Sequence, residues 1–586
     1  MKSFRKLLQY LKPYMFFAVI GPLFMVLEVA MDLIQPTIMQ HIIDVGIANQ
    51  DFHYVIKMGI FMIGAAALGL IGGLGCMMYS TKAAVNFAKD IRKDVFTKIE
   101  MFSSENRESF GTGKLLTIVT NDITSIQAAM TMTLRVLVRG PLLFIGSIII
   151  VFVTAKDLFS ILLVVVPILL VAIVFIAGNA SGSFRRVQEA LDKVNTKLQE
   201  NLSGVRVVKA YVRQNHEISQ FEKVNKNLTG INIRAVQIIS LMMPIIMLVV
   251  NGGIVATLWI GGVKILNGTL QVGAILAFIN YLNMILMSLM SISMVFIQIA
   301  RAFPSADRVQ QVLETNVDIE NEKNVYQPEE VKGNVEFKHV SYSYSYSKNN
   351  EYVLKDISFT ARKGEKIGII GPTGSGKSTL VKLLPRLYDV DQGAIFVDGV
   401  NVKEYDLQVL RSSIGFVPQK ALLFSGSIEE NMRYGKEEAT QGEIESASGA
   451  ACATEFINKL ENTYQYNLTQ GGTNLSGGQK QRLSIARALV RKPSILVLDD
   501  STSAVDAKAE GIIQTALKEE HTETTTFLIA SKISSVIDAD QILVLDHGEL
   551  VGSGTHEYLI ETCEVYQDIY LSQGGSLHQE RGKEHA

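Results

Sequence analysis

The chain has 586 residues, of which 48% are hydrophobic and 19% are charged. Counting the 46 glycines, the apolar share is about 56%, above the level of about 45–50% that is usual for soluble proteins, and the mean hydropathy is +0.23. This composition excludes a disordered or coiled-coil chain, and a net charge of −2 argues against a nucleic-acid partner. Cys76, Cys452 and Cys563 are too scattered for a disulfide framework or a zinc site.

Long apolar runs are concentrated in the first half of the chain. Met58–Thr81, Leu158–Phe184 and Ala235–Val263 carry no charged residue over 24, 27 and 29 positions, and each exceeds the ~20 residues with which a helix crosses a bilayer. The complete pattern predicts six membrane-spanning helices, at about 13–45, 55–81, 134–155, 157–184, 235–263 and 273–300.

The segments between these runs differ in charge. The amino end and two long connections, 82–127 and 185–234, are rich in Lys and Arg, whereas the other loops are short and hold two lysines between them. Because basic loops remain on the cytoplasmic side, we expect a multi-pass protein of the cell membrane with both termini in the cytoplasm. The long connections also have helical patterns, so the spans are expected to project beyond the bilayer.

The composition changes after the last run. Residues 316–333 are acidic and contain proline, which predicts a linker between a transmembrane domain at 1–315 and a second domain at 334–573. The second domain alternates short β-like runs with helices, a pattern typical of α/β proteins. A polar tail follows at 574–586.

A phosphate-binding loop follows the apolar strand predicted at Lys366–Ile370. Residues 371–378 match G-x-x-x-x-G-K-[ST], a pattern whose backbone N–H groups face phosphate oxygens at a helix N-terminus. Lys377 would reach the β- and γ-phosphates and Ser378 would bind Mg²⁺. The predicted ATP-binding residues of the loop are Gly371, Pro372, Thr373, Gly374, Ser375, Gly376, Lys377, Ser378 and Thr379.

Two further motifs follow in order. The sequence LSGGQ precedes a helical segment, and Ile495–Asp499 is an apolar strand that ends in a carboxylate suited to hold Mg²⁺ through water. With these three motifs the chain resembles, over essentially its whole length, the half-transporters among ATP-binding cassette (ABC) exporters, in which six spans are fused to one nucleotide-binding domain. The LSGGQ residues are Leu475, Ser476, Gly477, Gly478 and Gln479.

The resemblance implies a fold class, cofactors and further site residues. The fold is a multi-domain one, an all-α six-helix transmembrane domain followed by a cytoplasmic α/β P-loop nucleotide-binding domain with an α-helical subdomain. ATP and Mg²⁺ would bind there, with the ion held by Ser378, Gln419 and Asp499. Tyr344 would stack on adenine, although Tyr342 and Tyr346 share its strand face and remain alternatives.

In the same family two nucleotide-binding domains sandwich ATP head to tail. Each site combines the phosphate-binding loop of one chain with the LSGGQ sequence of the other, and Asp506 matches the adjoining D-loop. Two positions here depart from the family pattern. Asp500 stands where the family has a glutamate that activates the attacking water, and Ser531 stands where it has a histidine that contacts the γ-phosphate.

These two departures predict a weak hydrolytic site. Aspartate is one methylene shorter than glutamate, and a misplacement of ~1 Å can cost ~10²-fold in rate. Serine lacks the imidazole that would polarise the site. Because LSGGQ is intact, the chain is predicted to complete the site of a second half-transporter that retains the glutamate and the histidine. Gln470, where many homodimeric relatives have glutamate, fits the same branch of the family.

Two cytoplasmic segments are expected to couple ATP to the membrane, by resemblance. They are Thr120–Thr124 and Gly204–Tyr211, the second of which would dock on the partner's nucleotide domain.

Two groups in the spans are candidates for contact with cargo. Glu28 and Asp32 share one helix face inside the first span, and carboxylates within the membrane are costly and usually functional. They would bind a cationic cargo, form a structural pair with an arginine or with the backbone, or face a water-filled cavity. The methionines form a stripe suited to apolar cargo or to helix packing; they are Met284, Met287, Met290 and Met294.

The sequence therefore predicts one subunit of a heterodimeric ABC exporter, an ATPase coupled to transport. It would export amphipathic drugs or lipids, with membrane lipids and hydrophobic or cationic small molecules as its non-protein partners. A homodimeric lipid flippase of the same fold, or an ATP-gated regulatory or channel-like assembly, remains an alternative.

Overall fold

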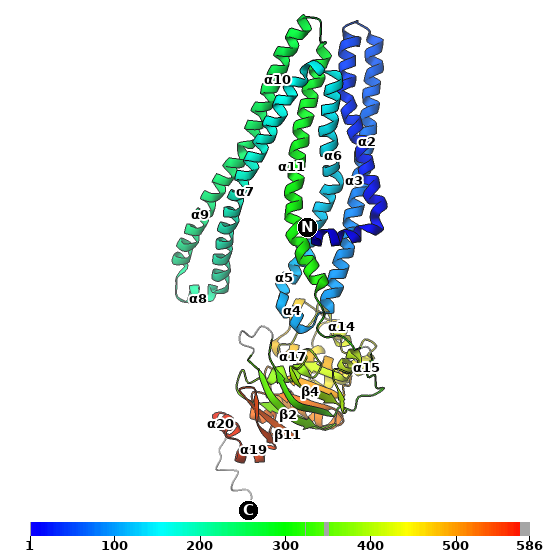
Figure 1. Ribbon diagram of the computed structural model, residues 1–586. Helices are drawn as coiled ribbons and strands as arrows, with labels where there is room; N and C mark the ends of the chain where they lie inside the picture. Colours follow the sequence, from blue (N-terminus) through cyan, green and yellow to red (C-terminus); the bar gives the residue numbers. More distant parts are fainter. Residues whose placement is uncertain (1, 323, 345–350, 575–586) are drawn as a thin grey trace, which may run out of the picture. The chain divides into compact units, whose positions relative to one another are not determined.

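The computed structural model describes residues 2–322, 324–344 and 351–574. Within this described part the chain forms two compact units (Figure 1). The first, called the helical unit below, comprises residues up to Lys98 and Leu115–Glu314. The second, called the α/β unit, comprises Ile99–Lys114 and the chain from Thr315 onward. The polar tail predicted at 574–586 lies outside the described residues except for Gly574.

The helical unit has no β-strand among its described residues, and its helices follow the apolar runs. Short 3-10 turns occur at Leu8–Tyr14 and Lys156–Leu158, and π-helical turns at Ile42–Ile47 and Ile118–Asp122. Its α-helices are α1 (Lys2–Leu7), α2 (Met15–His41), α3 (Phe52–Glu100), α5 (Thr112–Thr117), α6 (Ile123–Thr154), α7 (Phe159–Ser203), α8 (Val205–Ala210), α9 (Gln214–Ser240), α10 (Met242–Leu266) and α11 (Val272–Glu314).

Six helical stretches of the described chain are long and apolar enough to cross a membrane, which confirms the predicted number of spans. Several helices are much longer than a bilayer requires. Helix α3 has 49 residues, about 74 Å at ~1.5 Å per residue, whereas the hydrocarbon layer is ~30 Å thick. The long basic connections are helical, as predicted, because α3 and α7 continue through them.

The segment Thr120–Thr124 lies inside the helical unit. Its Asp122 carboxylate, only 4% exposed, accepts hydrogen bonds from Arg308 Nε at 2.7 Å and from Ser305 Oγ at 2.8 Å, both on α11. This ion pair fixes the start of α6 against α11. The part of this connection that belongs to the α/β unit is Ile99–Lys114, earlier in the chain, and coupling at Thr120–Thr124 stays a prediction.

The α/β unit contains two main sheets among its described residues. A six-stranded sheet has the order β12-β11-β3-β10-β9-β6, in which β12 alone is antiparallel to its neighbour, and a four-stranded antiparallel sheet has the order β2-β1-β4-β5. A short pair joins β7 and β8. The strands are β1 (Val335–Tyr342), β2 (Leu354–Ala361), β3 (Lys366–Ile370), β4 (Gln392–Val397), β5 (Val400–Asn401), β6 (Ile414–Val417), β7 (Gly426–Ser427), β8 (Asn467–Leu468), β9 (Ile495–Asp499), β10 (Thr525–Ile529), β11 (Gln541–Asp546) and β12 (Glu549–Gly554).

Helices flank these strands and complete the α/β fold. Two apolar clusters form the core, one between the two sheets and α12, the other between the six-stranded sheet and the helices from α14 onward. The buried, β-branched runs Lys366–Ile370 and Ile495–Asp499 form the central parallel strands, as their composition predicts. The helices are α4 (Ser104–Phe110), α12 (Lys377–Leu383), α13 (Leu407–Ser413), α14 (Ile428–Arg433), α15 (Gln441–Ala450), α16 (Thr454–Ile457), α17 (Gly477–Leu489), α18 (Ala507–Glu520), α19 (His556–Thr562) and α20 (Glu564–Ser572).

The described part of the segment predicted as a linker, 316–333, lies against the α/β unit. The backbone of Tyr326 exchanges hydrogen bonds with Glu404 and Asp406, at 2.7 and 3.1 Å, and the Tyr326 ring meets Tyr405 edge-on. This segment is therefore docked on the domain that follows it.

Candidate nucleotide site

The loop Gly371–Ser378 connects strand β3 to helix α12 at the carboxyl end of the parallel strands. Gly371 has φ +153°, and a Cβ atom there would lie 2.0 Å from the carbonyl oxygen of Leu545. Gly376 has φ +98°, a left-handed conformation, and a Cβ atom there would lie 2.8 Å from the Leu354 side chain. Glycine is required at both positions, so the tight loop predicted from the motif has a direct steric cause.

Lys377 turns back over this loop. Its Nζ donates hydrogen bonds to the carbonyl oxygens of Gly371 at 2.8 Å and Pro372 at 2.7 Å. Burial lowers the pKa of Lys377, while the carboxylates of Asp500 and Asp499 oppose this shift. The ammonium group is thus held among oxygen acceptors in a partly desolvated position, which fits a group that binds phosphate oxygens.

Ser378 and Asp499 are two of the three residues predicted to hold Mg²⁺, with Gln419 as the third. Ser378 Oγ donates a hydrogen bond to Asp499 Oδ1 at 2.7 Å, and burial raises the pKa of Asp499. Hydroxyl and carboxylate oxygens are ligands that Mg²⁺ prefers. No cluster of three His, Cys, Asp or Glu side chains suited to a metal occurs in the described chain. Binding of an ion by Ser378, Gln419 and Asp499, with further ligands from a nucleotide and water, stays a prediction.

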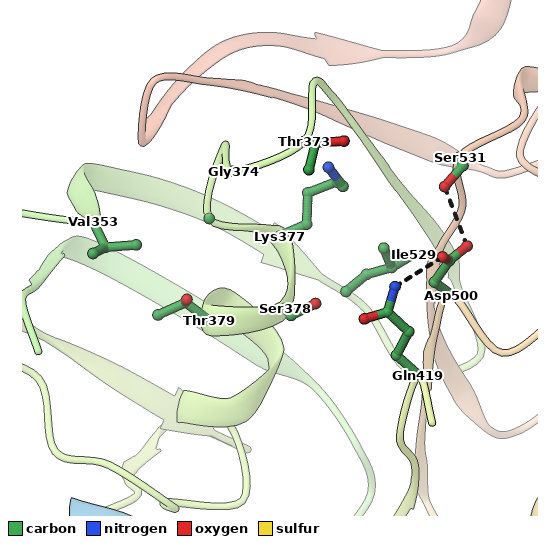
Figure 2. Close-up of a pocket in the computed structure, with 11 residues that line it drawn as sticks. Val353, Thr373, Gly374, Lys377, Ser378, Thr379, Gln419, Asp500, Ile529 and Ser531 are labelled. Atoms are coloured by element: carbon green, nitrogen blue, oxygen red, sulfur yellow. Dashed lines mark hydrogen bonds between the residues drawn. The ribbon is translucent and has the colours of Figure 1, made fainter. Parts of the chain in front are cut away.

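Asp500, Gln419 and Ser531 meet beside this pair (Figure 2). Gln419 Nε2 donates to Asp500 Oδ2 at 3.1 Å, and Ser531 Oγ donates to Asp500 Oδ1 at 3.3 Å. Asp500 has φ +47°, in the left-handed region that residues other than glycine seldom adopt. The two positions that depart from the family pattern are therefore in direct contact, and both oxygens of the Asp500 carboxylate are engaged by side chains.

These groups line one cavity of about 370 Å³. Lys377 and Ser378 lie on one side of it and Asp500 and Ser531 on the other (Figure 2). Its lining residues are Val353, Thr373, Gly374, Gly376, Lys377, Ser378, Thr379, Gln419, Asp500, Ile529 and Ser531.

Tyr344 lies beside helix α12, with its ring edge-on to Tyr342 and Tyr388 at 5.0 and 5.4 Å between ring centroids. Its hydroxyl is 3.0 Å from Thr379 Oγ1, and burial raises its pKa. Tyr344 is absent from the described residues that line the cavity, where Val353 occupies the wall. Tyr342 is buried in the core, and Tyr346 lies outside the described residues. Adenine stacking by Tyr344 stays a prediction.

The LSGGQ sequence begins helix α17. Ser476 Oγ accepts from Gln479 N at 3.3 Å and Gln479 Oε1 accepts from Ser476 N at 2.9 Å, a reciprocal pair that satisfies the first turn. Ser476 and Gly477 are exposed, and no LSGGQ residue is among the described residues lining the chain's own cavity. Asp506 caps helix α18, accepting from Ala509 N at 2.9 Å, and this hydrogen bond lowers the pKa of Asp506.

Helix α4 contacts the region beside this site, a contact that the sequence analysis missed. Tyr388 donates a hydrogen bond to Glu108 Oε1 of α4 at 2.8 Å. Asn106 Nδ2 donates to Asp318 Oδ2 at 2.5 Å. Both ends of α4 have signals in the sequence, since Ser103 caps its start together with Asn106 and Gly111, with φ +75°, ends it. The residues that α4 contacts in the fold have no such signal.

Gln573, after helix α20, is a second residue that sequence reasoning missed. Its Nε2 donates to the carbonyl oxygen of Ser531 at 3.0 Å, and its Oε1 accepts from the N–H of Ile533 at 2.9 Å. The amide thus holds both sides of the loop that carries Ser531. No sequence pattern joins residues 40 positions apart in this way.

In the helical unit, the two carboxylates of α2 share one arginine of α6. Arg139 Nη2 lies 3.0 Å from Asp32 Oδ2 and 3.4 Å from Glu28 Oε1. Of the predicted roles, a structural pair with an arginine agrees with this geometry, whereas a cationic cargo would have to displace Arg139.

The methionine stripe of α11 divides into two faces. Met284 and Met290 pack against the apolar core formed with α7 and α10. Met287 and Met294 are 61% and 64% exposed. The stripe therefore serves helix packing at two positions and presents thioether side chains at the other two.

Comparison with known proteins agrees with this architecture. Residues 18–289 match the family described as "ABC transporter transmembrane region", and residues 354–503 match the family described as "ABC transporter". A Bacillus subtilis protein named "Uncharacterized ABC transporter ATP-binding protein YfiB" is 41% identical over 97% of this chain and 99% of its own length.

Two other known proteins are also similar to this chain. The Bacillus subtilis protein named "Probable multidrug resistance ABC transporter ATP-binding/permease protein YheI" is 33% identical over 88% of both chains. The structure titled "Structure of a bacterial Atm1-family ABC exporter with ATP bound" has a TM-score of 0.77 at 24% identity, covering 95% of this chain and 98% of that one, which indicates a shared fold. With both family regions in one chain and six apolar helices before the α/β unit, this multi-pass membrane protein belongs to the ATP-binding cassette transporters and has the architecture of an exporter half-transporter.

Proposed function

We propose that this chain is one half of a heterodimeric ABC exporter. Its own site binds ATP and Mg²⁺ but hydrolyses ATP slowly, and its LSGGQ sequence completes the faster site of a second half-transporter. ATP binding would close the two nucleotide-binding domains and open the membrane path outward, and hydrolysis at the partner's site would reset it.

The observation that supports this proposal most directly is the hydrogen bonding of Asp500. Its carboxylate accepts from Gln419 and from Ser531, so the oxygens that would take a proton from water already have donors. The side chain is also one methylene shorter than the family glutamate, and positional errors of ~1 Å cost ~10²-fold. Loss of general-base catalysis typically costs ~10²–10⁴-fold. Lys377, Ser378 and Asp499 remain in place for binding, which supports ATP retention without rapid turnover.

The signature sequence supports the second half of the proposal. Ser476 is exposed at the first turn of α17 and lies outside the chain's own cavity. Its hydroxyl and the neighbouring N–H groups are suited to cap a γ-phosphate bound to another chain. The partner would carry Glu after its metal-binding aspartate and His at the position of Ser531.

The cargo proposed is an amphipathic small molecule, a drug or a lipid, that leaves the cell through the helical unit. The exposed methionines Met287 and Met294 and the name of the YheI relative support this class. Under the same proposal both termini and the α/β unit lie in the cytoplasm, which the basic residues of the long connections support.

The decisive experiment separates binding from turnover in the purified native complex. We expect Lys377→Ala to shorten nucleotide residence on this chain and to leave most steady-state hydrolysis. Ser476→Ala is expected to abolish nearly all hydrolysis while this chain retains nucleotide. Residence is measured by photo-crosslinking labelled ATP to each chain, and turnover by phosphate release.

A gain-of-function variant provides the matched control. Asp500→Glu combined with Ser531→His is expected to raise turnover at this chain's own site by about 10²-fold. Equal losses of hydrolysis from the Lys377 and Ser476 variants would contradict the division of labour. Recovery of this chain only with itself would contradict the heterodimer and favour an ATP-gated assembly with two weak sites.

A further inference from the structure

A charged cavity lies between helices α2, α3 and α6 of the helical unit. Its volume is about 480 Å³, within the range of small-molecule sites. Four of its lining side chains carry charge, two carboxylates on α2 and two guanidinium groups on α6, all within membrane-spanning helices. The full lining is Met25, Glu28, Asp32, Gln35, Ala66, Gly69, Leu70, Gly73, Leu74, Met77, Arg135, Val136 and Arg139.

The two arginines differ in their partners. Arg139 contacts both carboxylates, since its Nη2 lies 3.4 Å from Glu28 Oε1 and 3.0 Å from Asp32 Oδ2, and it neutralises one of their two negative charges. Arg135, one helical turn earlier, forms no hydrogen bond or ion pair that involves a described residue, and its Nε atom is buried without an acceptor. A guanidinium group has five N–H donors, and a buried donor without an acceptor inside a membrane span, as at Arg135 Nε, is costly.

The cavity also has an apolar side, formed by helix α3. Gly73 leaves room for the Glu28 carboxylate, because a Cβ atom there would lie 3.1 Å from Glu28 Oε2. On the same helix, Leu70, Leu74 and Met77 are more than half exposed beside the charged groups. One side of the cavity is therefore apolar, and the other carries charged groups that include Arg135, which has no partner among the described residues.

We infer that this cavity binds the anionic head group of an amphipathic molecule, with a phosphate, sulfate or carboxylate on Arg135 and the apolar part along α3. A guanidinium group takes such an anion through two parallel hydrogen bonds. Glu28 and Asp32, which share Arg139, keep one net negative charge and so disfavour a ligand with a second anionic group beside them. The inference that this ligand is transported depends on the export function proposed above. The inference that the cavity binds it does not.

The test uses three dodecyl probes with different head groups: dodecyl phosphate, dodecyltrimethylammonium and dodecyl maltoside. Binding to the purified complex in lipid nanodiscs is followed by competition against a fluorescent alkyl phosphate. We expect dodecyl phosphate to compete at least about tenfold more strongly than the other two, and Arg135→Gln to remove that advantage. Arg135→Lys, which keeps the charge but loses the planar fork, should retain an intermediate affinity.

Arg301→Gln is the matched control, since Arg301 is an exposed arginine of α11 outside the cavity. It should bind dodecyl phosphate like the unmodified protein. Competition by inorganic phosphate alone would identify a free anion as the ligand, and phosphatidylglycerol retained with the complex in native mass spectrometry would identify a lipid; both use the proposed chemistry.

Equal binding of the cationic probe, or unchanged binding in Arg135→Gln, would overturn the inference. Dissociation of the complex by Arg135→Gln would also overturn it, because Arg135 would then pair with the other half-transporter. Anion binding without ATP-driven transport of any probe would leave the site standing and contradict the export function.

Discussion

Replacing Tyr388 by phenylalanine removes one hydroxyl group from the contact between helix α4 and the rest of the α/β unit. That hydroxyl donates to Glu108 Oε1 at 2.8 Å. Tyr388 is 5% exposed, and burial raises its pKa, aided by the Glu108 carboxylate. A protected hydrogen bond to a charged group contributes ~1.5–3 kcal/mol. Because Glu108 itself is exposed, we expect about 1 kcal/mol, near the upper limit for solvent-screened pairs.

This free energy corresponds to about a fivefold increase in the opening of α4. Hydrogen–deuterium exchange of peptides covering Ser104–Phe110, measured in the purified complex, reports that opening. Tyr388→Phe and Glu108→Ala should each accelerate exchange about fivefold, and the double variant should be no faster than either single one, since both remove the same bond.

The control is Tyr405→Phe. It removes a buried hydroxyl that donates to the carbonyl oxygen of Val397 at 3.0 Å in the same unit, away from α4. Exchange in α4 should stay unchanged in this variant. Multiplicative effects of Tyr388→Phe and Glu108→Ala, or faster exchange in α4 with the Tyr405 variant, would refute the reasoning.

Three further predictions concern other contacts. Gln573→Ala should accelerate exchange of the loop at 531–533 about fivefold, from the loss of one part-buried and one exposed hydrogen bond. Gln567→Ala on α20, whose side-chain amide donates to the carbonyl oxygen of Ile560, should not. The ammonium of Lys436 and the N–H of Thr440 lower the pKa of Glu443 to about 2. Glu443→Gln should therefore lower Tm at pH 7, and the difference should shrink as pH falls from about 5 toward 2, where the native carboxylate also becomes protonated. Asp122→Asn, which breaks a half-buried ion pair, should cost about 2 kcal/mol, measured as loss of Tm in detergent.

Much of the nucleotide site was predictable because its determinants are local. The glycines of the loop at 371–376 have the positive φ values that the motif implies. Lys377 and Ser378 come directly after them, as the first two residues of α12. Asp499 ends a fully buried strand, as an apolar run closed by a carboxylate predicts. Short-range sterics and strand composition control each of these features.

The contact between Asp500 and Ser531, the two residues that differ from the family pattern, depends on the pairing of strands in the sheet. Asp500 and Ser531 follow β9 and β10, which pair in parallel register. Parallel neighbours end at the same edge, so two positions 31 residues apart come within hydrogen-bond distance. The sequence identified both residues, but only the pairing of the strands brought their side chains together.

In the membrane, length and hydropathy determined the number of helices, because a segment crossing lipid must satisfy its backbone hydrogen bonds internally. They did not determine the faces at which those helices meet. From the sequence, Glu28 and Asp32 were candidates for a cargo site or for a structural role, and the packing of α2 against α6 brings Arg139 into contact with both carboxylates. The sequence alone thus determined motif chemistry, span number and the local shape of the phosphate loop, all governed by neighbouring residues. The tertiary structure alone decided which distant charges are paired, that Arg135 has no partner among the described residues, and that α4 belongs with the α/β unit. These features depend on contacts between helices and strands far apart in the chain.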